Sequence, residues 1–106
     1  LGKFDEARQD LDRALSINPN NVEALYNKGT VLQAQGNIHT ALECYSTVLG
    51  HNPNHSSACY NVAVLLADLG KTEQALTYLS SAIVAQPHFV AALLLRARLL
   101  LNSVRT

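Results

Sequence analysis

The apolar positions of the chain recur with the spacing of a helix. Between residues 2 and 19 they fall at Phe4, Ala7, Leu11, Ala14 and Leu15, which lie on one side of an α-helix. Five further segments have helical periodicity, and none alternates with the period of two that is typical of strands. The pattern predicts an all-α chain of six helices, at residues 2–19, 22–35, 37–50, 57–69, 72–85 and 89–103.

Glycine and proline divide the chain at a constant interval of 34 residues. The repeated residues are Gly2, Gly36 and Gly70, and Pro19, Pro53 and Pro87. A fixed period between about 20 and 50 residues indicates a stack of similar supersecondary units, each packed on its neighbours. The interval therefore predicts helix pairs joined by short turns.

Local signals place the turns between these helices. Asn20 followed by Glu23 resembles a capping box that would start the second helix. Gly36 is expected to form a left-handed turn, and Asn37 to cap the third helix. Gly29 lies inside a predicted helix, where glycine costs about 1 kcal/mol relative to alanine. We therefore expect another helix to cross Gly29 at short distance.

Each 34-residue unit carries small and large apolar residues in a fixed order. They are Leu25, Lys28, Gly29, Leu32, Ala41, Tyr45, Val48 and Pro53 in one unit, and Cys59, Val62, Ala63, Leu66, Ala75, Leu79, Ala82 and Pro87 in the next. With two helices and a final proline, this unit resembles the tetratricopeptide repeat. It departs from the family pattern at Lys28 and Val48, where leucine and alanine are usual, and at Leu25 and Cys59, where an aromatic residue is usual.

The resemblance implies a right-handed α–α superhelix, a solenoid of stacked antiparallel helix pairs. It divides the chain into the second helix of a truncated repeat (1–19), two full repeats (20–53 and 54–87) and the first helix of a further repeat (88–106). The related pentatricopeptide class, which reads single-stranded RNA, has a period of about 35 and needs a basic surface. The interval of 34 and the zero net charge disfavour that class.

The resemblance also implies where a partner binds, because the first helices of such arrays line a concave groove. The matching positions here are Tyr26, Asn27, Thr30, Gln33, Tyr60, Asn61, Val64, Asp68, Leu94 and Arg98. The amides of Asn27 and Asn61 could pair with the backbone of an extended or helical peptide, or bond locally or to water. Chaperone-binding members hold a carboxylate with lysine, asparagine and arginine. Only Asn61 of that clamp is present, so we do not expect it to operate.

Composition removes several other classes of function. A hydrophobic content of 48% excludes disorder, and no apolar run approaches the ~20 residues that cross a bilayer. Eight basic and eight acidic residues cancel, so we expect neither a nucleic-acid nor a membrane partner. No Ser/His/Asp set, carboxylate pair or glycine-rich phosphate loop has a suitable spacing. We therefore expect neither catalysis nor a cofactor.

The cysteines and the paired histidines suggest no further chemistry. Cys44 and Cys59 lack the spacing of a redox or zinc motif and are expected to be small buried residues, with a disulfide as the minor alternative. His51 and His55 are four residues apart, but Pro53 lies between them and places both in a turn. We therefore expect no metal site.

The last predicted helix is apolar almost all round, which is typical of a helix buried on several sides. Truncation of a longer array would explain this pattern. Alternatively, copies of the chain could associate head to tail through Leu94, Leu95, Leu99 and Leu101. A third interpretation is a substrate-presenting or regulatory arm of a larger enzyme. The main expectation is a non-catalytic scaffold for a protein or peptide partner.

Overall fold

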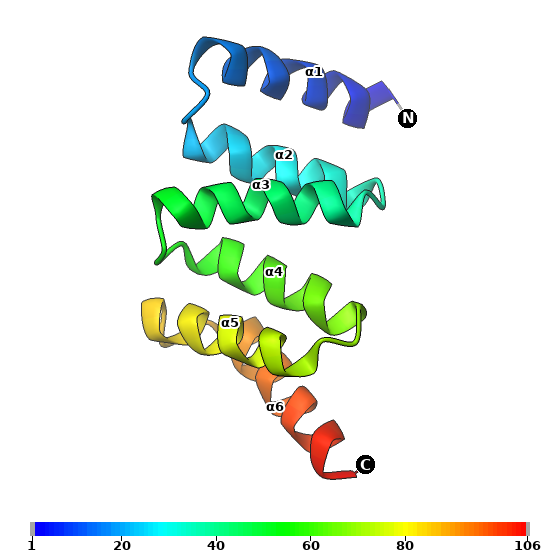
Figure 1. The fold of residues 1–106 in the computed structure, drawn as a ribbon, viewed down its shortest axis with the longest axis vertical. Coiled ribbons are helices and arrows are strands. Elements are labelled where there is room, and N and C mark those ends of the chain that lie inside the picture. Colours follow the sequence, from blue (N-terminus) through cyan, green and yellow to red (C-terminus); the bar gives the residue numbers. More distant parts are fainter. Residues whose placement is uncertain (1, 106) are drawn as a thin grey trace. The chain divides into compact units, whose positions relative to one another are not determined.

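The computed structural model describes residues 2–105, which form six helices and no strand, as the sequence predicts. The helices are α1 (Gly2–Ile17), α2 (Val22–Ala34), α3 (Ile38–His51), α4 (Ser56–Asp68), α5 (Thr72–Ala85) and α6 (Val90–Arg105) (Figure 1). The predicted helix bounds are wrong by at most two residues. The largest differences are that α1 ends before Asn18 and that α6 continues past Ser103.

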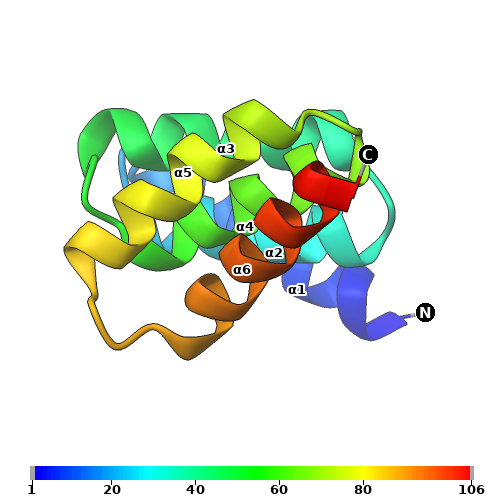
Figure 2. The same cartoon turned by 90° about the horizontal axis from the view of Figure 1, so that it is seen from below.

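The chain forms two compact units, residues 1–53 and residues 54–106. In the first unit α2 packs against both α1 and α3, and in the second α5 packs against both α4 and α6. The pairs α2–α3 and α4–α5 are antiparallel (Figure 1), and α5 and α6 also run in opposite directions (Figure 2). Each unit therefore consists of one tightly packed helix pair and one further helix.

The α2–α3 pair is held together by a glycine against a tyrosine. Tyr45 is fully buried, and its ring lies directly over Gly29 of α2. A Cβ atom on Gly29 would lie 2.5 Å from Cε1 of Tyr45, well inside van der Waals contact. The expectation that a second helix approaches Gly29 closely is confirmed. Ala24, Leu32, Ala41 and Val48 complete the buried residues of this pair.

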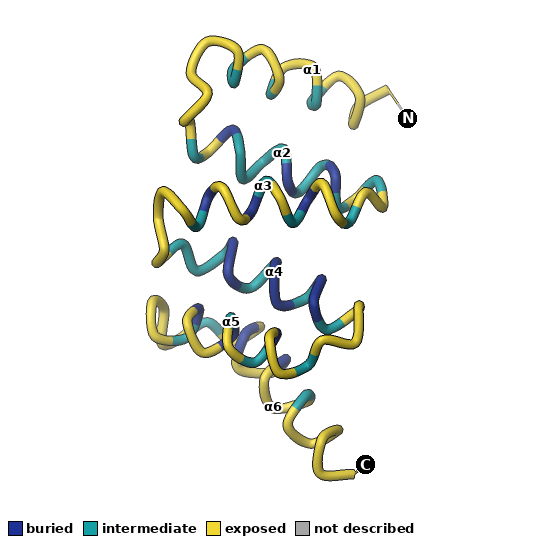
Figure 3. Tube along the Cα trace, viewed as in Figure 1, coloured by how far each residue is buried: buried dark blue, intermediate teal, exposed yellow. Residues whose placement is uncertain are grey.

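In the second unit α4 supplies most of the core. Six of its residues are buried, namely Ala58, Cys59, Val62, Ala63, Leu65 and Leu66. Opposite them α5 buries Ala75, Leu79 and Ala82, and α6 buries only Ala92 and Leu95. By contrast, α1 buries no residue, so the helices at the start and end of the described range are mostly exposed (Figure 3).

The turns after α2 and α4 are built in the same way around a glycine. Gly36 has φ 82°, and its N–H donates to the carbonyl of Gln33 at 3.0 Å, while the N–H of Asn37 donates to the carbonyl of Leu32 at 2.8 Å. Gly70 has φ 79° and the same pair of bonds. This is the Schellman arrangement, which requires a left-handed residue. The predicted left-handed turn at Gly36 is confirmed.

Replacing Gly36 with alanine is expected to lower the free energy of unfolding by about 1–2 kcal/mol, because a Cβ atom is disfavoured in the left-handed region. Gly50 is the matched control, since it lies in α3, lacks a positive φ and has open space where a Cβ atom would stand, with no other atom within 4 Å. There alanine is expected to stabilise by up to about 1 kcal/mol. Urea denaturation of both variants tests the difference, and equal effects would contradict this view of the turn.

The predicted N-caps need correction. The cap of α2 is Asn21 rather than Asn20, and its Oδ1 accepts the backbone N–H of Ala24 at 3.0 Å. Asn37 precedes α3 but makes no capping bond with its side chain. Its backbone, at φ −86° and ψ 73°, is not in the extended conformation that Asn21 has at φ −70° and ψ 106°. A side-chain cap usually needs that extended conformation.

Candidate functional site

In the first unit, three of the predicted groove residues, all partly buried, are positioned by contacts with α3 or within α2. The rings of Tyr26 and Tyr45 have centroids 5.8 Å apart at an angle of 44°. The hydroxyl of Tyr45 donates to Oε1 of Gln33 at 2.7 Å. The hydroxyl of Thr30 instead donates to the carbonyl of Asn27 at 2.7 Å. Tyr26 and Gln33 are therefore held against the buried tyrosine, and the Thr30 donor is already used.

Asn27 borders a hollow between α1 and α2 with a volume of about 200 Å³. The hollow is lined by Leu11, Ala14, Asn21, Glu23, Ala24 and Asn27. Alkyl side chains from both helices form its apolar part, whereas two amides and one carboxylate supply its polar part. Within the described residues no hydrogen bond engages the side-chain amide of Asn27. This amide can therefore donate to and accept from a bound molecule.

In the second unit, Tyr60 of α4 packs against Phe89, the residue that precedes α6. Their ring centroids are 5.1 Å apart at an angle of 40°. Beside Tyr60, Asn61 is partly buried, as is Val64 one turn further along α4. Asp68, Leu94 and Arg98 are exposed. Tyr26 and Asn27 lie in one unit and Tyr60 and Asn61 in the other, so their alignment along a common groove stays a prediction.

One residue predicted for self-association is not available to a partner. Leu95 is only 6% exposed, because it faces the core of the second unit. Leu99 is partly buried and lines a second hollow, of about 310 Å³, with Ala67, Thr72, Asn102 and Ser103. Leu94 and Leu101 are exposed, at 65% and 53%. The prediction of Leu95 as an adhesive residue is therefore wrong, because a helix that is apolar all round still turns one side inward.

Sequence reasoning also missed Leu11, Ala14 and Asn21, which line the first hollow. A signal for them exists in the 34-residue register. Asn21 stands at the position that Phe89 occupies two intervals later, so a small polar side chain replaces a large aromatic one. When a small side chain stands where the equivalent helix junction has a large one, unfilled space is expected beside the small side chain.

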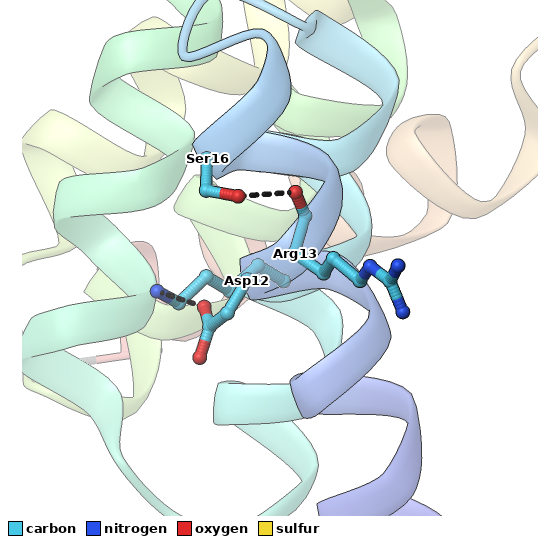
Figure 4. A network of polar contacts seen from close by, with 4 residues as sticks. Asp12, Arg13 and Ser16 are labelled. Carbon is cyan, nitrogen blue, oxygen red and sulfur yellow. Dashed lines mark hydrogen bonds and ion pairs between the residues drawn. The ribbon is translucent and has the colours of Figure 1, made fainter.

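Lys28, which departs from the family pattern, forms an ion pair with a residue of α1. Its Nζ atom lies 2.7 Å from Oδ1 of Asp12 in α1 (Figure 4). The two side chains are 26% and 50% exposed, so the pair contributes at most about 1 kcal/mol. Lys28 therefore links α1 to α2.

The two cysteine thiols and His55 have structural rather than chemical roles. Neither cysteine forms a disulfide, and Cys59 is buried as predicted while Cys44 is partly exposed. Burial raises the pKa of both thiols above the ordinary value, although Lys28 opposes this at Cys44. At neutral pH both are therefore protonated and poor nucleophiles. His55 is the N-cap of α4, where its Nδ1 accepts the N–H of Ala58 at 3.0 Å.

Residues 2–105 contain neither a metal-binding cluster nor a helix that could span a membrane. No three His, Cys, Asp or Glu side chains gather in a way that could hold a metal ion. Among the described helices, none has the length and apolar character to cross a bilayer. The groove positions and these two hollows are candidate binding features among the described residues.

Two family models match the sequence. One is described as anaphase-promoting complex, cyclosome, subunit 3 and matches residues 1–82. The other is described as tetratricopeptide repeat and matches residues 63–105. Together they cover nearly all of the chain. No curated protein sequence gives a significant match.

Solved structures are similar over most of the chain. YrrB, a tetratricopeptide protein with an unusual peptide-binding site, is 33% identical at a TM-score of 0.81, over 92% of this chain and 50% of its own. An O-GlcNAc transferase of Thermobaculum terrenum is 28% identical at 0.75, over 80% and 16%. The first repeat domain of Spaghetti, bound to an HSP90 peptide, is 16% identical at 0.89, over 99% and 82%.

The present chain thus spans half the length of YrrB. The chain belongs to the tetratricopeptide repeat family, and its fold is an all-α helical repeat solenoid.

Proposed function

We propose that the chain is a non-catalytic scaffold that binds a peptide segment of a partner protein on the faces of its first helices. The observation that carries the proposal is the environment of Asn27. Its amide is partly exposed, has no hydrogen bond within the described residues and borders a hollow with apolar walls. A peptide can supply both interactions: its backbone amide can hydrogen-bond with Asn27, and an apolar side chain can fill the hollow.

The neighbouring residues suit the same ligand. Tyr26 presents a half-buried ring that is held in place by Tyr45, so its ordering costs little entropy when a partner binds. Tyr60 is held in a similar way by Phe89 in the second unit, next to Asn61. Aromatic anchors beside amides are typical of peptide-binding surfaces. Each unit therefore offers one tyrosine and one asparagine to a peptide.

Similar structures support peptide binding as a class. YrrB is described as having a peptide-binding site, and Spaghetti is bound to a peptide of sequence SRMEEVD. Glu23 borders the hollow in the present chain, and the lysine and arginine of the carboxylate clamp are missing. We therefore propose that the preferred peptide is neutral or basic and that SRMEEVD binds weakly.

Selection of a displayed peptide library against the chain tests the proposal, followed by fluorescence anisotropy with the selected peptides. Asn27→Ala, and Tyr60→Ala combined with Asn61→Ala, are each expected to weaken binding about tenfold or more. Glu43→Ala in α3 and Ser80→Ala in α5 are the controls, since both residues are exposed on the second helices. Equal losses in the controls, with helicity unchanged, would contradict the proposed site.

A second proposal has one observation in its favour. The similar O-GlcNAc transferase is a much longer chain, of which the match covers 16%. Residues 1–106 could therefore serve as a substrate-presenting or regulatory arm of an enzyme. Mass spectrometry of the native protein tests this idea. A longer polypeptide with a catalytic domain would support it, and a mass of 11.5 kDa would contradict it.

A further inference from the structure

Exposed apolar side chains are concentrated on two helices. Of the ten large ones that are exposed within residues 2–105, six lie on α6 and two on α1. They are Val90, Leu93, Leu94, Leu100, Leu101 and Val104 on α6, and Phe4 and Ile17 on α1. Exposed apolar residues gathered on one helix, as on α6, mark an interaction site more often than scattered ones do.

Tyr26 and Tyr60 occupy the same position of the repeat as Leu94, and their contacts show what a side chain at that position normally packs against. Tyr26 precedes Leu94 by two intervals of 34, and it packs against Tyr45 in the second helix of its repeat. Tyr60 precedes Leu94 by one interval, and it packs against Phe89, just before the next first helix. A side chain at this position thus sits between a second helix and the start of the following first helix.

Leu94 has no such neighbours within the described residues and is 65% exposed. Residues equivalent to these neighbours are present near the other end of the described chain. Leu11 of α1 corresponds to Tyr45, and Asn21 corresponds to Phe89. Both line the hollow of about 200 Å³ between α1 and α2. The chain therefore carries an exposed side chain and the matching cavity on two different units.

We propose that Leu94 of one copy enters the α1–α2 hollow of a second copy, and that α6 and the second copy's α1 then pack as a complete helix pair. This goes beyond peptide binding but uses the same hollow, so Leu94 of a second copy and an apolar side chain of a peptide would compete for it. The repeat register gives the remaining contacts. Since Gly29 meets Tyr45, Ala97 on α6 is expected to meet Leu11 of the second copy.

The residue types at that contact are suitable. Ala97 and Leu11 are the same pair of residue types as Ala63 and Leu79, which occupy the equivalent positions in the second unit and are both fully buried. An alanine facing a leucine at this close approach is therefore already accommodated within this chain. Leu101 would lie beside the same leucine, at the position from which Gln33 contacts Tyr45.

Charge also favours a second copy as the occupant. α6 carries three arginines, Arg96, Arg98 and Arg105, and no acidic residue. α1 carries four acidic and three basic residues. The approach of α6 to the α1 of another copy is therefore weakly attractive, whereas two α6 helices would bring six arginines together and repel each other. The contact joins different surfaces, so association continues into open chains instead of stopping at a dimer.

Light scattering from about 10 µM to about 1 mM tests this inference, because a weak contact of this kind becomes populated in that range. The average mass is expected to rise with concentration. Leu94→Asp, which places a charge in the apolar contact, and Ala14→Arg, which fills the hollow, are each expected to raise the dissociation constant about tenfold or more. Val84→Asp is the control, since Val84 is 82% exposed on α5 and lies outside the proposed contact.

Mixing the two variants gives a stricter test. Leu94→Asp keeps an intact hollow, and Ala14→Arg keeps an intact Leu94, so an equimolar mixture is expected to form a discrete heterodimer. An α6–α6 contact would instead be insensitive to Ala14→Arg, and that result would overturn the proposal. Circular dichroism checks that both variants keep their helicity. If one does not, Leu101→Asp replaces Leu94→Asp and Ala14→Glu replaces Ala14→Arg.

Two other outcomes would also overturn the proposal. One is a constant mass of 11.5 kDa over the whole range, and the other is an equal effect of Val84→Asp, which would indicate unspecific adhesion. Tyr60→Ala combined with Asn61→Ala lies outside the α1–α2 hollow and is expected to weaken peptide binding while leaving association unchanged. Loss of peptide binding in that variant with association retained distinguishes the failure of one proposal from the failure of the other.

Discussion

Gly29→Ala is expected to lower the free energy of unfolding by about 1–3 kcal/mol, although alanine is the better helix former. The added Cβ atom would lie 2.5 Å from the Tyr45 ring, and that ring is fully buried and held by its bond to Gln33. Moving this buried and hydrogen-bonded ring aside to make room for the Cβ atom therefore costs free energy. Urea denaturation followed by circular dichroism measures the loss.

Tyr45→Leu combined with Gly29→Ala should recover part of this loss. The double variant has the alanine and leucine that the second unit carries at Ala63 and Leu79. We expect the two effects to be non-additive, with a coupling of about 1 kcal/mol or more in favour of the double variant. If the two changes in the free energy of unfolding simply add, Tyr45 is not the reason that position 29 carries glycine.

The fold could be predicted from the sequence because its determinants are local and repeated. The interval of 34 residues set the number of helices, and Gly36 and Gly70 marked two turns that only a left-handed residue can form. The exact N-cap residues were harder to predict from the sequence. Asn20, Asn21 and Asn37 are chemically alike, and backbone angles decide which of them accepts a capping hydrogen bond.

The binding features could be predicted only in part. The family register indicated Tyr26, Asn27 and Gln33, but it could not show that Tyr45 fixes two of them and leaves Asn27 beside a hollow. That hollow depends on the space left between α1 and α2, and the periodicity of apolar residues in each helix gives no information about that space. Leu95 shows the same limit, because in a helix that is apolar all round no pattern identifies the buried side.

The largest expected effect on stability is that of Leu79→Ala, about 2–5 kcal/mol, because this side chain is fully buried between α5 and α4. Leu11 is its matched control, since it is the same residue at the equivalent position of α1 but is partly exposed. Leu11→Ala is expected to cost only about 1 kcal/mol in dilute solution. A similar cost for both variants would contradict the burial described here.

The same comparison made at higher concentration connects stability with association. Docking of a second copy would cover Leu11, and a contact made only by the folded state stabilises that state by mass action. The cost of Leu11→Ala should therefore rise with protein concentration, whereas that of Leu79→Ala should not. Thermal denaturation at about 10 µM and about 1 mM would show this as a growing difference in Tm between the Leu11 variant and the unmodified chain. A difference that stays constant would mean that α1 remains uncovered, and the exposed leucines of α6 would then need another partner.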